Sequence, residues 1–163
     1  MQSLIARSAH ALSTGDYSAA QVDGALAGAF GVDTQLLRDC TYFVVQAGEE
    51  LVGCGGWSWR RTLFGGDARA DRDPEPLDPA HEAAKIRAFF VHPEWARRGI
   101  GTALLERCER EAVARGFRRF ELMATLPGVR LYAARGYVGA APVQWAMPGG
   151  LSIEFVPMSK SAP

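Results

Sequence analysis

The chain lacks most of the features that mark specialised protein classes. Its three cysteines, Cys40, Cys54 and Cys108, are few, widely spaced and odd in number. Such a set fits neither a disulfide framework nor a zinc site, so we expect reduced packing residues and no metal. No stretch approaches the ~18 uninterrupted apolar residues of a membrane helix, and the N-terminus has no apolar signal core. We therefore expect a cytoplasmic protein with no membrane partner.

The chain also has no formal net charge, because its 18 Lys and Arg residues balance its 18 Asp and Glu residues. Such a surface has no overall attraction for nucleic acid, so any anion site must come from a local cluster. The hydrophobic fraction of 48% is ordinary for a globular protein. A chain of 163 residues is most simply one domain. We predict a single domain over residues 1–163.

Hydrophobic periodicity and chain breakers predict an alternating order of helices and strands. The expected helices are 1–10, 18–30, 34–38, 99–115 and 128–135. The expected strands are 41–46, 51–61, 85–92, 120–124, 137–146 and 151–158. The strand–helix–strand unit implies a right-handed crossover and a locally parallel pair, and the other strands are expected to be antiparallel. The fold class is therefore α/β, with a mixed, mostly antiparallel sheet.

The segment 65–82 differs from its surroundings in composition. It contains a Gly-Gly pair, three prolines and many acidic residues, but few large apolar ones. We predict a mobile surface loop, which either steers an amine cation or is a solvated linker. Four aromatic residues, Trp57, Trp59, Phe64 and Trp95, either line an acceptor pocket or belong to the core.

The segment 91–102 carries the most chemical information. A strand ends there, a loop with Arg97, Arg98, Gly99 and Gly101 follows, and a long helix begins. The first amides of a helix have no intrahelical partner, and the helix dipole adds positive charge at that end. Glycines allow close approach by phosphates, so the segment predicts an anion site suited to a pyrophosphate. A Walker loop is excluded because no Gly-Lys-Ser/Thr follows, and Leu104 stands where a Rossmann fingerprint needs its third glycine.

The segment 86–137, roughly a third of the chain, resembles the Gcn5-related N-acetyltransferase (GNAT) superfamily. That family combines an apolar strand, a Gln/Arg-x-x-Gly-x-Gly/Ala loop, a helix, a strand and a Tyr-x-x-x-Gly-aromatic ending. The loop here is residues 96–101, Ala-Arg-Arg-Gly-Ile-Gly, and the ending is residues 132–137, Tyr-Ala-Ala-Arg-Gly-Tyr. The chain departs from the pattern at Ala96, where the family has Gln or Arg, and Arg97 is the residue that could supply the charge.

A second departure concerns the start of the fold. Proteins that resemble this family usually begin with a strand before the first helix, whereas residue 1 here already adjoins the predicted helix. The resemblance therefore implies a GNAT-like sheet, with helices on both faces, that lacks the first strand. An open sheet edge of this kind favours self-association, so we expect a homodimer.

The resemblance implies acetyl-CoA as the acyl donor. Its pyrophosphate would lie on the loop amides, and its pantetheine arm would pair with the preceding strand. A backbone amide near Phe90 would polarise the thioester carbonyl. The residues that the resemblance assigns to cofactor binding are Phe90, Val91, Arg97, Arg98, Gly99, Ile100, Gly101 and Thr102.

Tyr132 matches the family's usual general acid, since a phenol can protonate a departing thiolate. The general base stays open, because the strand 86–90 has no carboxylate. Four side chains are candidates: Glu82, Glu121, His81 and His92. A water relay, or an acceptor that is already neutral, would remove the need for a base.

The resemblance implies an N-acetyltransferase that moves an acetyl group from acetyl-CoA to an amine of a small molecule or a peptide by direct attack. The alternative is a catalytically silent module that binds acyl-CoA and regulates a partner. A third reading is a nucleotide- or phosphate-binding domain of another class. The acceptor, the acyl chain length and the oligomeric state do not follow from the residues.

Overall fold

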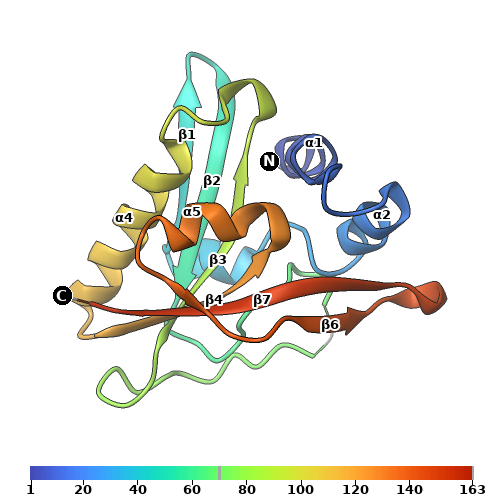
Figure 1. Ribbon diagram of the computed structural model, residues 1–163. Coiled ribbons are helices and arrows are strands. Elements are labelled where there is room, and N and C mark those ends of the chain that lie inside the picture. The colour runs from blue at the N-terminus through green and yellow to red at the C-terminus, as the bar shows by residue number, and fades with distance from the viewer. Residues whose placement is uncertain (70, 163) are drawn as a thin grey trace.

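A computed structural model describes residues 1–69 and 71–162 of the chain (Figure 1). The helices are α1 Gln2–Ser13, α2 Ala19–Leu26, α3 Thr34–Arg38, α4 Ile100–Ala114 and α5 Val129–Ala133, and the short 3-10 turns are η1 Pro93–Trp95, η2 Leu126–Gly128 and η3 Pro148–Gly150. The strands are β1 Tyr42–Ala47, β2 Glu50–Ser58, β3 Ala84–Val91, β4 Arg119–Thr125, β5 Val138–Gly139, β6 Val143–Ala146 and β7 Ser152–Ser161.

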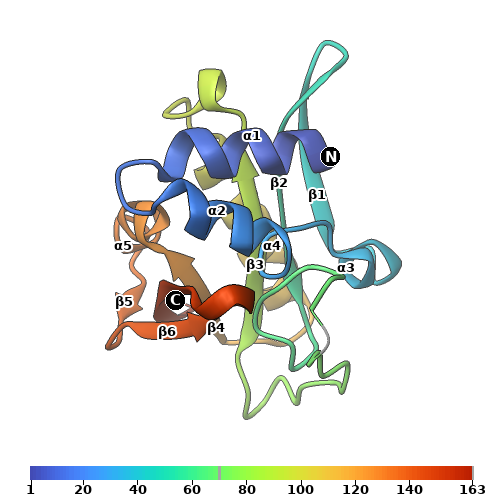
Figure 2. The same cartoon turned by 90° about the vertical axis from the view of Figure 1, so that its right-hand side faces the viewer.

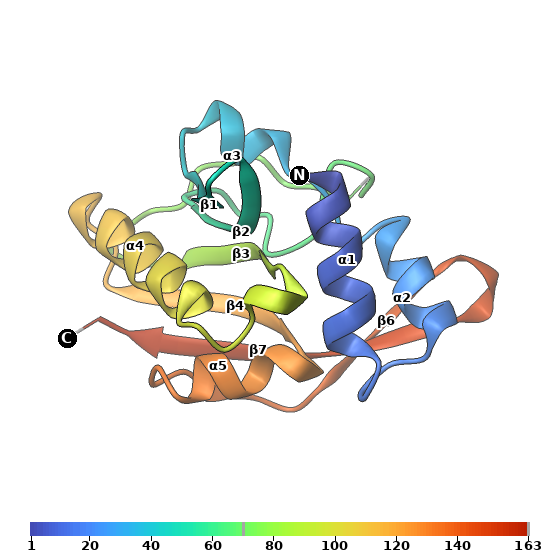
Figure 3. The same ribbon diagram turned by 90° about the horizontal axis from the view of Figure 1, so that it is seen from above.

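One mixed sheet organises the molecule. Its strand order is β1-β2-β3-β4-β7-β5, and β6 pairs with β7 further along. Only β3 and β4 are parallel among the described strands, because α4 connects them as a crossover. Helices α1 and α2 lie on one face and α4 on the other (Figures 2 and 3). The prediction of a mostly antiparallel mixed sheet with helices on both faces is confirmed.

The described N-terminal part of the fold consists of helices. Within residues 1–69 and 71–162, no strand precedes α1, and no strand pairs with the outer edge of β1. Ser18 and Gln21 form a capping box at the start of α2, in which each side chain bonds the other residue's backbone amide. The described helices include none that is long and apolar enough to cross a membrane.

The two faces of the sheet bury separate cores. On the α4 face, the rings of Trp57 and Phe117 pack edge to face. The apolar side of α4 packs against β2 and β3. On the α1–α2 face, Phe30 packs against Phe90 and Phe155 with ring centroids 6.0 and 6.3 Å apart. These cores fix both walls of any opening that runs through the sheet.

Strands β3 and β4 separate soon after they begin. Their parallel register includes two residue pairs, Ala84 with Phe120 and Lys85 with Glu121. Beyond Lys85 the two strands no longer pair, so the sheet opens between the second half of β3 and the end of β4.

A β-bulge in β3 lies beside this opening. Cys54 of β2 pairs with Phe90, but Gly56 pairs with Arg87, so two residues of β3 stand opposite Gly55. The first of them, Ala88, has a left-handed φ of +59°. The Tyr42 hydroxyl lies 3.3 Å from the Ala88 carbonyl oxygen and donates to it.

One local expectation was wrong. The predicted strand 137–146 is two short strands, β5 and β6, since Pro142 between them has no N–H for a ladder. The described part of 65–82 contains no helix or named strand, as expected of a loop, and it is held by hydrogen bonds. The amides of Arg61, Thr62 and Leu77 fasten it to residues 59–62, just after β2. Its described residues are therefore an anchored flap rather than a free linker.

Candidate functional site

A cavity of about 80 Å³ passes through the opening between β3 and β4. On one side it touches Phe89 and Tyr132, which belong to the α4-face core. On the other it touches Phe30, Phe64 and Phe155, which belong to or pack against the α1–α2-face core. The cavity therefore connects the two faces at the bulge.

Tyr132 is the titratable side chain of this cavity among the described residues that line it. It is only 8% exposed and lies edge to face with Phe89 and with Tyr137, at centroid distances of 6.2 and 5.8 Å. Burial, with a smaller contribution from the nearby Cys108 thiol, raises the pKa of Tyr132 above that of a free phenol. The phenol is therefore protonated at neutral pH, as a proton donor must be.

The loop after β3 has the backbone geometry of an anion site. Arg97 and Gly99 have left-handed φ values of +65° and +86°, and Gly99 is the N-cap of α4 without a side-chain cap. The first hydrogen bond of α4 joins the Ala103 amide to the Gly99 carbonyl. The amides of Ile100, Gly101 and Thr102 precede it, so they have no intrahelical acceptor.

Positive charge accompanies these amides. Arg97 and Arg98 are both exposed, and the Arg98 guanidinium lies 4.7 Å from the centre of the Trp95 ring. Free amides, a helix N-terminus and two guanidinium groups fit the pyrophosphate of a coenzyme A molecule.

Gly101 connects the loop to Tyr132. A Cβ at position 101 would lie 2.9 Å from a methyl group of Leu131, the residue before Tyr132 in α5. This glycine therefore allows the first turn of α4 to pack against α5, besides leaving backbone open to a ligand. Sequence reasoning gave it only the second role.

The strand residues predicted to bind pantetheine lie at the cavity. Phe90 lines it, and Val91 follows at the end of β3. The Val91 amide, however, donates to the Ser8 hydroxyl of α1 at 3.1 Å. A ligand that pairs with this amide must therefore displace Ser8.

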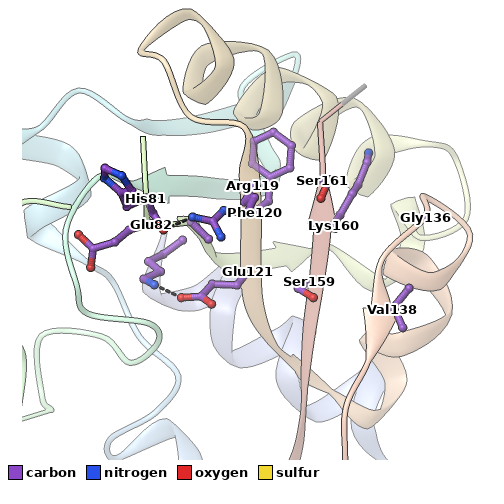
Figure 4. Close-up of a pocket in the computed structure, with 12 residues that line it drawn as sticks. His81, Glu82, Arg119, Phe120, Glu121, Gly136, Val138, Ser159, Lys160 and Ser161 are labelled. Atoms are coloured by element: carbon purple, nitrogen blue, oxygen red, sulfur yellow. Dashed lines mark hydrogen bonds and ion pairs between the residues drawn. The ribbon is translucent and has the colours of Figure 1, made fainter. Parts of the chain in front are cut away.

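None of the four candidate bases lines the cavity. Glu82, Glu121 and His81 lie in a groove at the other end of β3 and β4, where Lys85 pairs with Glu121 (Figure 4). His92 is buried beside the loop, and its imidazole faces Arg7, Glu50 and the Glu94 amide. The structure brings Tyr132, Phe90 and the loop to one region and leaves these bases outside it.

Of the four aromatic residues considered for an acceptor pocket, one lines the cavity and three do not. Phe64 lines the cavity, whereas Trp57 is 1% exposed in the α4-face core. Trp59 lies under the Arg60 guanidinium, and Trp95 under Arg98. Sequence reasoning missed the lining residues Phe30, Phe155 and Met123, which come from three separate segments: the turn after α2, β7 and β4.

A buried ionic cluster stands behind the cavity wall. The Asp33 carboxylate, fully buried, receives Arg87 and Arg72, each with an N–O distance of 2.5 Å. The Arg87 guanidinium also donates to the carbonyls of Thr62 and Gly65 at 2.6 Å. The charge of Asp33 is therefore compensated, and Arg87 fixes the segment 62–65, which carries Phe64.

The described residues contain no cluster of His, Cys, Asp and Glu side chains that could hold a metal ion. The site is thus defined by a phenol, an apolar cavity and an anion-binding loop.

A mixed sheet that opens at a bulge, beside a free helix N-terminus, fits the acyl-CoA-dependent acyltransferase class. The sequence profile of the Acetyltransferase (GNAT) family matches residues 12–137, most of the chain. The chain belongs to the GNAT family and is an acyltransferase. Members of this family typically use acetyl-CoA. Comparison with curated protein sequences found no match.

Solved structures of similar fold carry acetyltransferase names. A GCN5-related N-acetyltransferase from Rhodopseudomonas palustris is 19% identical, with a TM-score of 0.71 over 98% of this chain and 86% of that one. PaiA N-acetyltransferase from Thermoplasma acidophilum, in complex with coenzyme A, is 12% identical, with a TM-score of 0.63 over 98% and 89%. Ard1 from Thermoplasma volcanium is 17% identical, with a TM-score of 0.60 over 99% and 91%. At these identities the likeness concerns the fold alone.

Proposed function

We propose that this protein is an N-acetyltransferase that moves the acetyl group of acetyl-CoA to an amine of a small molecule or a peptide. The observation that supports this most strongly is the cavity through the sheet, which has Tyr132 on its wall. The loop of 97–102 follows the strand that carries Phe89 and Phe90, after the short turn η1. In this proposal the acyl donor, the amine acceptor and the proton donor Tyr132 meet at one opening in the sheet.

The loop would hold the donor. In this proposal the amides of Arg97, Arg98, Gly99, Ile100, Gly101 and Thr102 receive the pyrophosphate. Backbone groups of Phe90 and Val91 receive the pantetheine arm, after the Ser8 hydroxyl has moved from the Val91 amide. Acetyl-CoA supplies the activated acyl group, and a backbone amide at the bulge polarises its carbonyl.

Tyr132 would act as the general acid. In the transfer a C–N bond forms to the attacking amine and the C–S bond of the thioester breaks. The leaving sulfur takes the phenolic proton of Tyr132, whose burial keeps that proton in place at neutral pH. The surrounding aromatic rings exclude water, which limits hydrolysis of the thioester.

A ligand panel tests the donor assignment. Thermal melts would be recorded with acetyl-CoA, CoA, ATP and NAD at one common concentration, set at ~100 times the Kd for acetyl-CoA, where binding adds about 2.7 kcal/mol of stability. We expect a rise in Tm with acetyl-CoA and CoA alone. An equal rise with ATP or NAD would support a general nucleotide-binding domain, and no rise with any of them would refute the donor site.

A silent acyl-CoA-binding module is the second candidate, and one observation favours it. The described residues that line the cavity include no carboxylate and no imidazole to act as a base. Release of free CoA in the presence of a panel of amines separates the two readings. Binding of acetyl-CoA without release of CoA for any amine would favour the silent module.

A further inference from the structure

The acceptor side of the cavity has an unusual chemical character for an enzyme that acts on amines. Four phenylalanine rings gather there: Phe64 lies 5.4 Å from Phe155, which packs on Phe30, and Phe30 packs on Phe90. Met123 adds a flexible apolar side chain to the same wall. Such a wall favours a flat, apolar group, and it offers an ammonium ion only cation–π contact and no carboxylate.

Negative charge is absent from the described lining, although acidic residues lie close behind it. Asp33 is fully buried, and two guanidinium groups hold its carboxylate. Asp67 and Asp71 of the flap pair with Arg72 and Arg69 instead. An ammonium ion that entered would therefore lose its water without gaining a carboxylate, which is strongly unfavourable.

The missing base leads to the same conclusion. An alkylamine with a pKa around 10 is almost wholly protonated at neutral pH, so it must lose a proton before it can attack. None of the candidate bases Glu82, Glu121, His81 and His92 lines the cavity, which has Tyr132 as its titratable group among the described residues. An amine that is already neutral needs no such step.

We propose that the acceptor is an aromatic amine, uncharged at neutral pH, whose ring lies against Phe30, Phe64 and Phe155. This assignment rests on the proposed acetyltransferase function and specifies its acceptor. The amine nitrogen forms the new C–N bond, the C–S bond breaks, and Tyr132 gives its proton to the sulfur. The phenolate then takes the surplus proton from nitrogen, so the products are an anilide and CoA thiol, and Tyr132 is neutral again.

Two isomers test the assignment with size held constant. 4-Ethylaniline and 2-phenylethylamine have the same atoms, but the first is neutral and the second is an ammonium ion at pH 7. We expect kcat/KM for 4-ethylaniline to exceed that for its isomer by about tenfold or more at pH 7. It should also stay flat between about pH 6.5 and 8.5, whereas the value for 2-phenylethylamine should rise steadily with pH.

A matched pair of variants at Met123 tests the same preference by adding a charge to the cavity wall. Met123→Glu adds a carboxylate to the acceptor wall, and Met123→Gln adds the same length without charge. The Glu variant should shift the preference toward 2-phenylethylamine, and the Gln variant should not. If the Glu variant fails to fold, the comparison of the two isomers on the unchanged protein still decides.

The outcomes separate this proposal from the function on which it rests. Acetyl-CoA binding, measured by calorimetry, with turnover of 2-phenylethylamine equal to or above that of 4-ethylaniline overturns the aromatic-amine assignment alone. Acetyl-CoA binding with no turnover of either amine also overturns it, because the cavity then does not accept this class. No acetyl-CoA binding would reject the acetyltransferase function itself.

Discussion

Asp33 and Arg87 form an ion pair at 2.5 Å from which water is almost fully excluded, with side-chain exposures of 0% and 3%. The pair joins the N-cap of α3 to the residue just before the bulge of β3. Since Arg87 also holds the carbonyls of Thr62 and Gly65, this one guanidinium group connects α3, β3 and the segment that carries Phe64.

Replacing Arg87 by Met should destabilise the protein by about 3–5 kcal/mol, because it leaves Asp33 buried with part of its charge uncompensated. Urea denaturation monitored by circular dichroism measures this loss. Arg61→Met is the control, since Arg61 pairs with Glu82 at the surface and should matter far less. Equal losses of stability in the two variants would mean that the buried ion pair contributes no more than the surface pair.

Sequence reasoning succeeded where the chemistry is contiguous in the chain. The loop before α4, its glycines and the helix that follows lie within a dozen residues, and local rules for helix ends cover them. It failed for the acceptor wall. Phe30, Phe155 and Met123 meet only through the tertiary fold, and no short motif marks them.

The bulge shows a second limit. Ala88 adopts a positive φ, which alanine rarely does, so nothing in its identity signals the turn. The glycines of β2 lie where the pairing is irregular or a side chain comes close. Gly53 makes room for Ile100 and Gly55 for the Phe89 ring, and the register shifts next to Gly55.

Tyr132→Phe should lower kcat by about tenfold or more and leave the affinity for acetyl-CoA nearly unchanged, because it removes the acid but keeps the ring. Steady-state kinetics and calorimetry measure the two effects. Tyr137→Phe is the matched control, since Tyr137 packs on Tyr132 but does not line the cavity. A similar fall in kcat for both variants would assign Tyr132 a packing role.

Gly101→Ala should weaken acetyl-CoA binding, because the added methyl group meets a Leu131 methyl group at 2.9 Å and the Leu131 side chain must shift beside the loop. Adding Leu131→Ala removes the obstacle, so the double variant should bind acetyl-CoA more tightly than Gly101→Ala alone. Calorimetric Kd values for the single and double variants give the coupling between the two sites. Additive changes in the free energy of acetyl-CoA binding would show that the contact between positions 101 and 131 does not affect the binding loop.

Ser8→Ala tests whether the Val91 amide takes part in donor binding. The change frees this amide in the unliganded protein, at a cost of about 1 kcal/mol in stability. It also removes the competitor of the pantetheine arm, so acetyl-CoA should bind up to about fivefold more tightly. Ser13→Ala, another buried serine of α1, is the control and should leave the Kd unchanged. An unchanged or weaker affinity in Ser8→Ala would exclude competition at Val91.

The raised pKa values of the tyrosines predict how the stability of the protein changes at alkaline pH. Burial raises the pKa of Tyr17 to about 12 and also raises those of Tyr42, Tyr132 and Tyr137, which together are all four tyrosines of the chain. Above pH ~10 the unfolded chain loses these protons while the folded protein keeps them, so the unfolded state binds fewer protons. Stability should therefore be constant with respect to these groups below pH ~10 and fall as the pH rises beyond it.

Two measurements on the same samples check this expectation. Tyrosinate absorbance should stay low until the circular dichroism signal of the folded protein is lost, and both should then change together. Tyr17→Phe is the informative variant, because the Tyr17 hydroxyl donates to the Glu154 carbonyl and accepts from the Leu126 amide. It should lower stability at pH 7 and reduce the steepness of the alkaline fall, since one raised pKa is gone. Ionisation of the tyrosines near pH ~10 in a protein that is still folded would contradict the burial of these phenols.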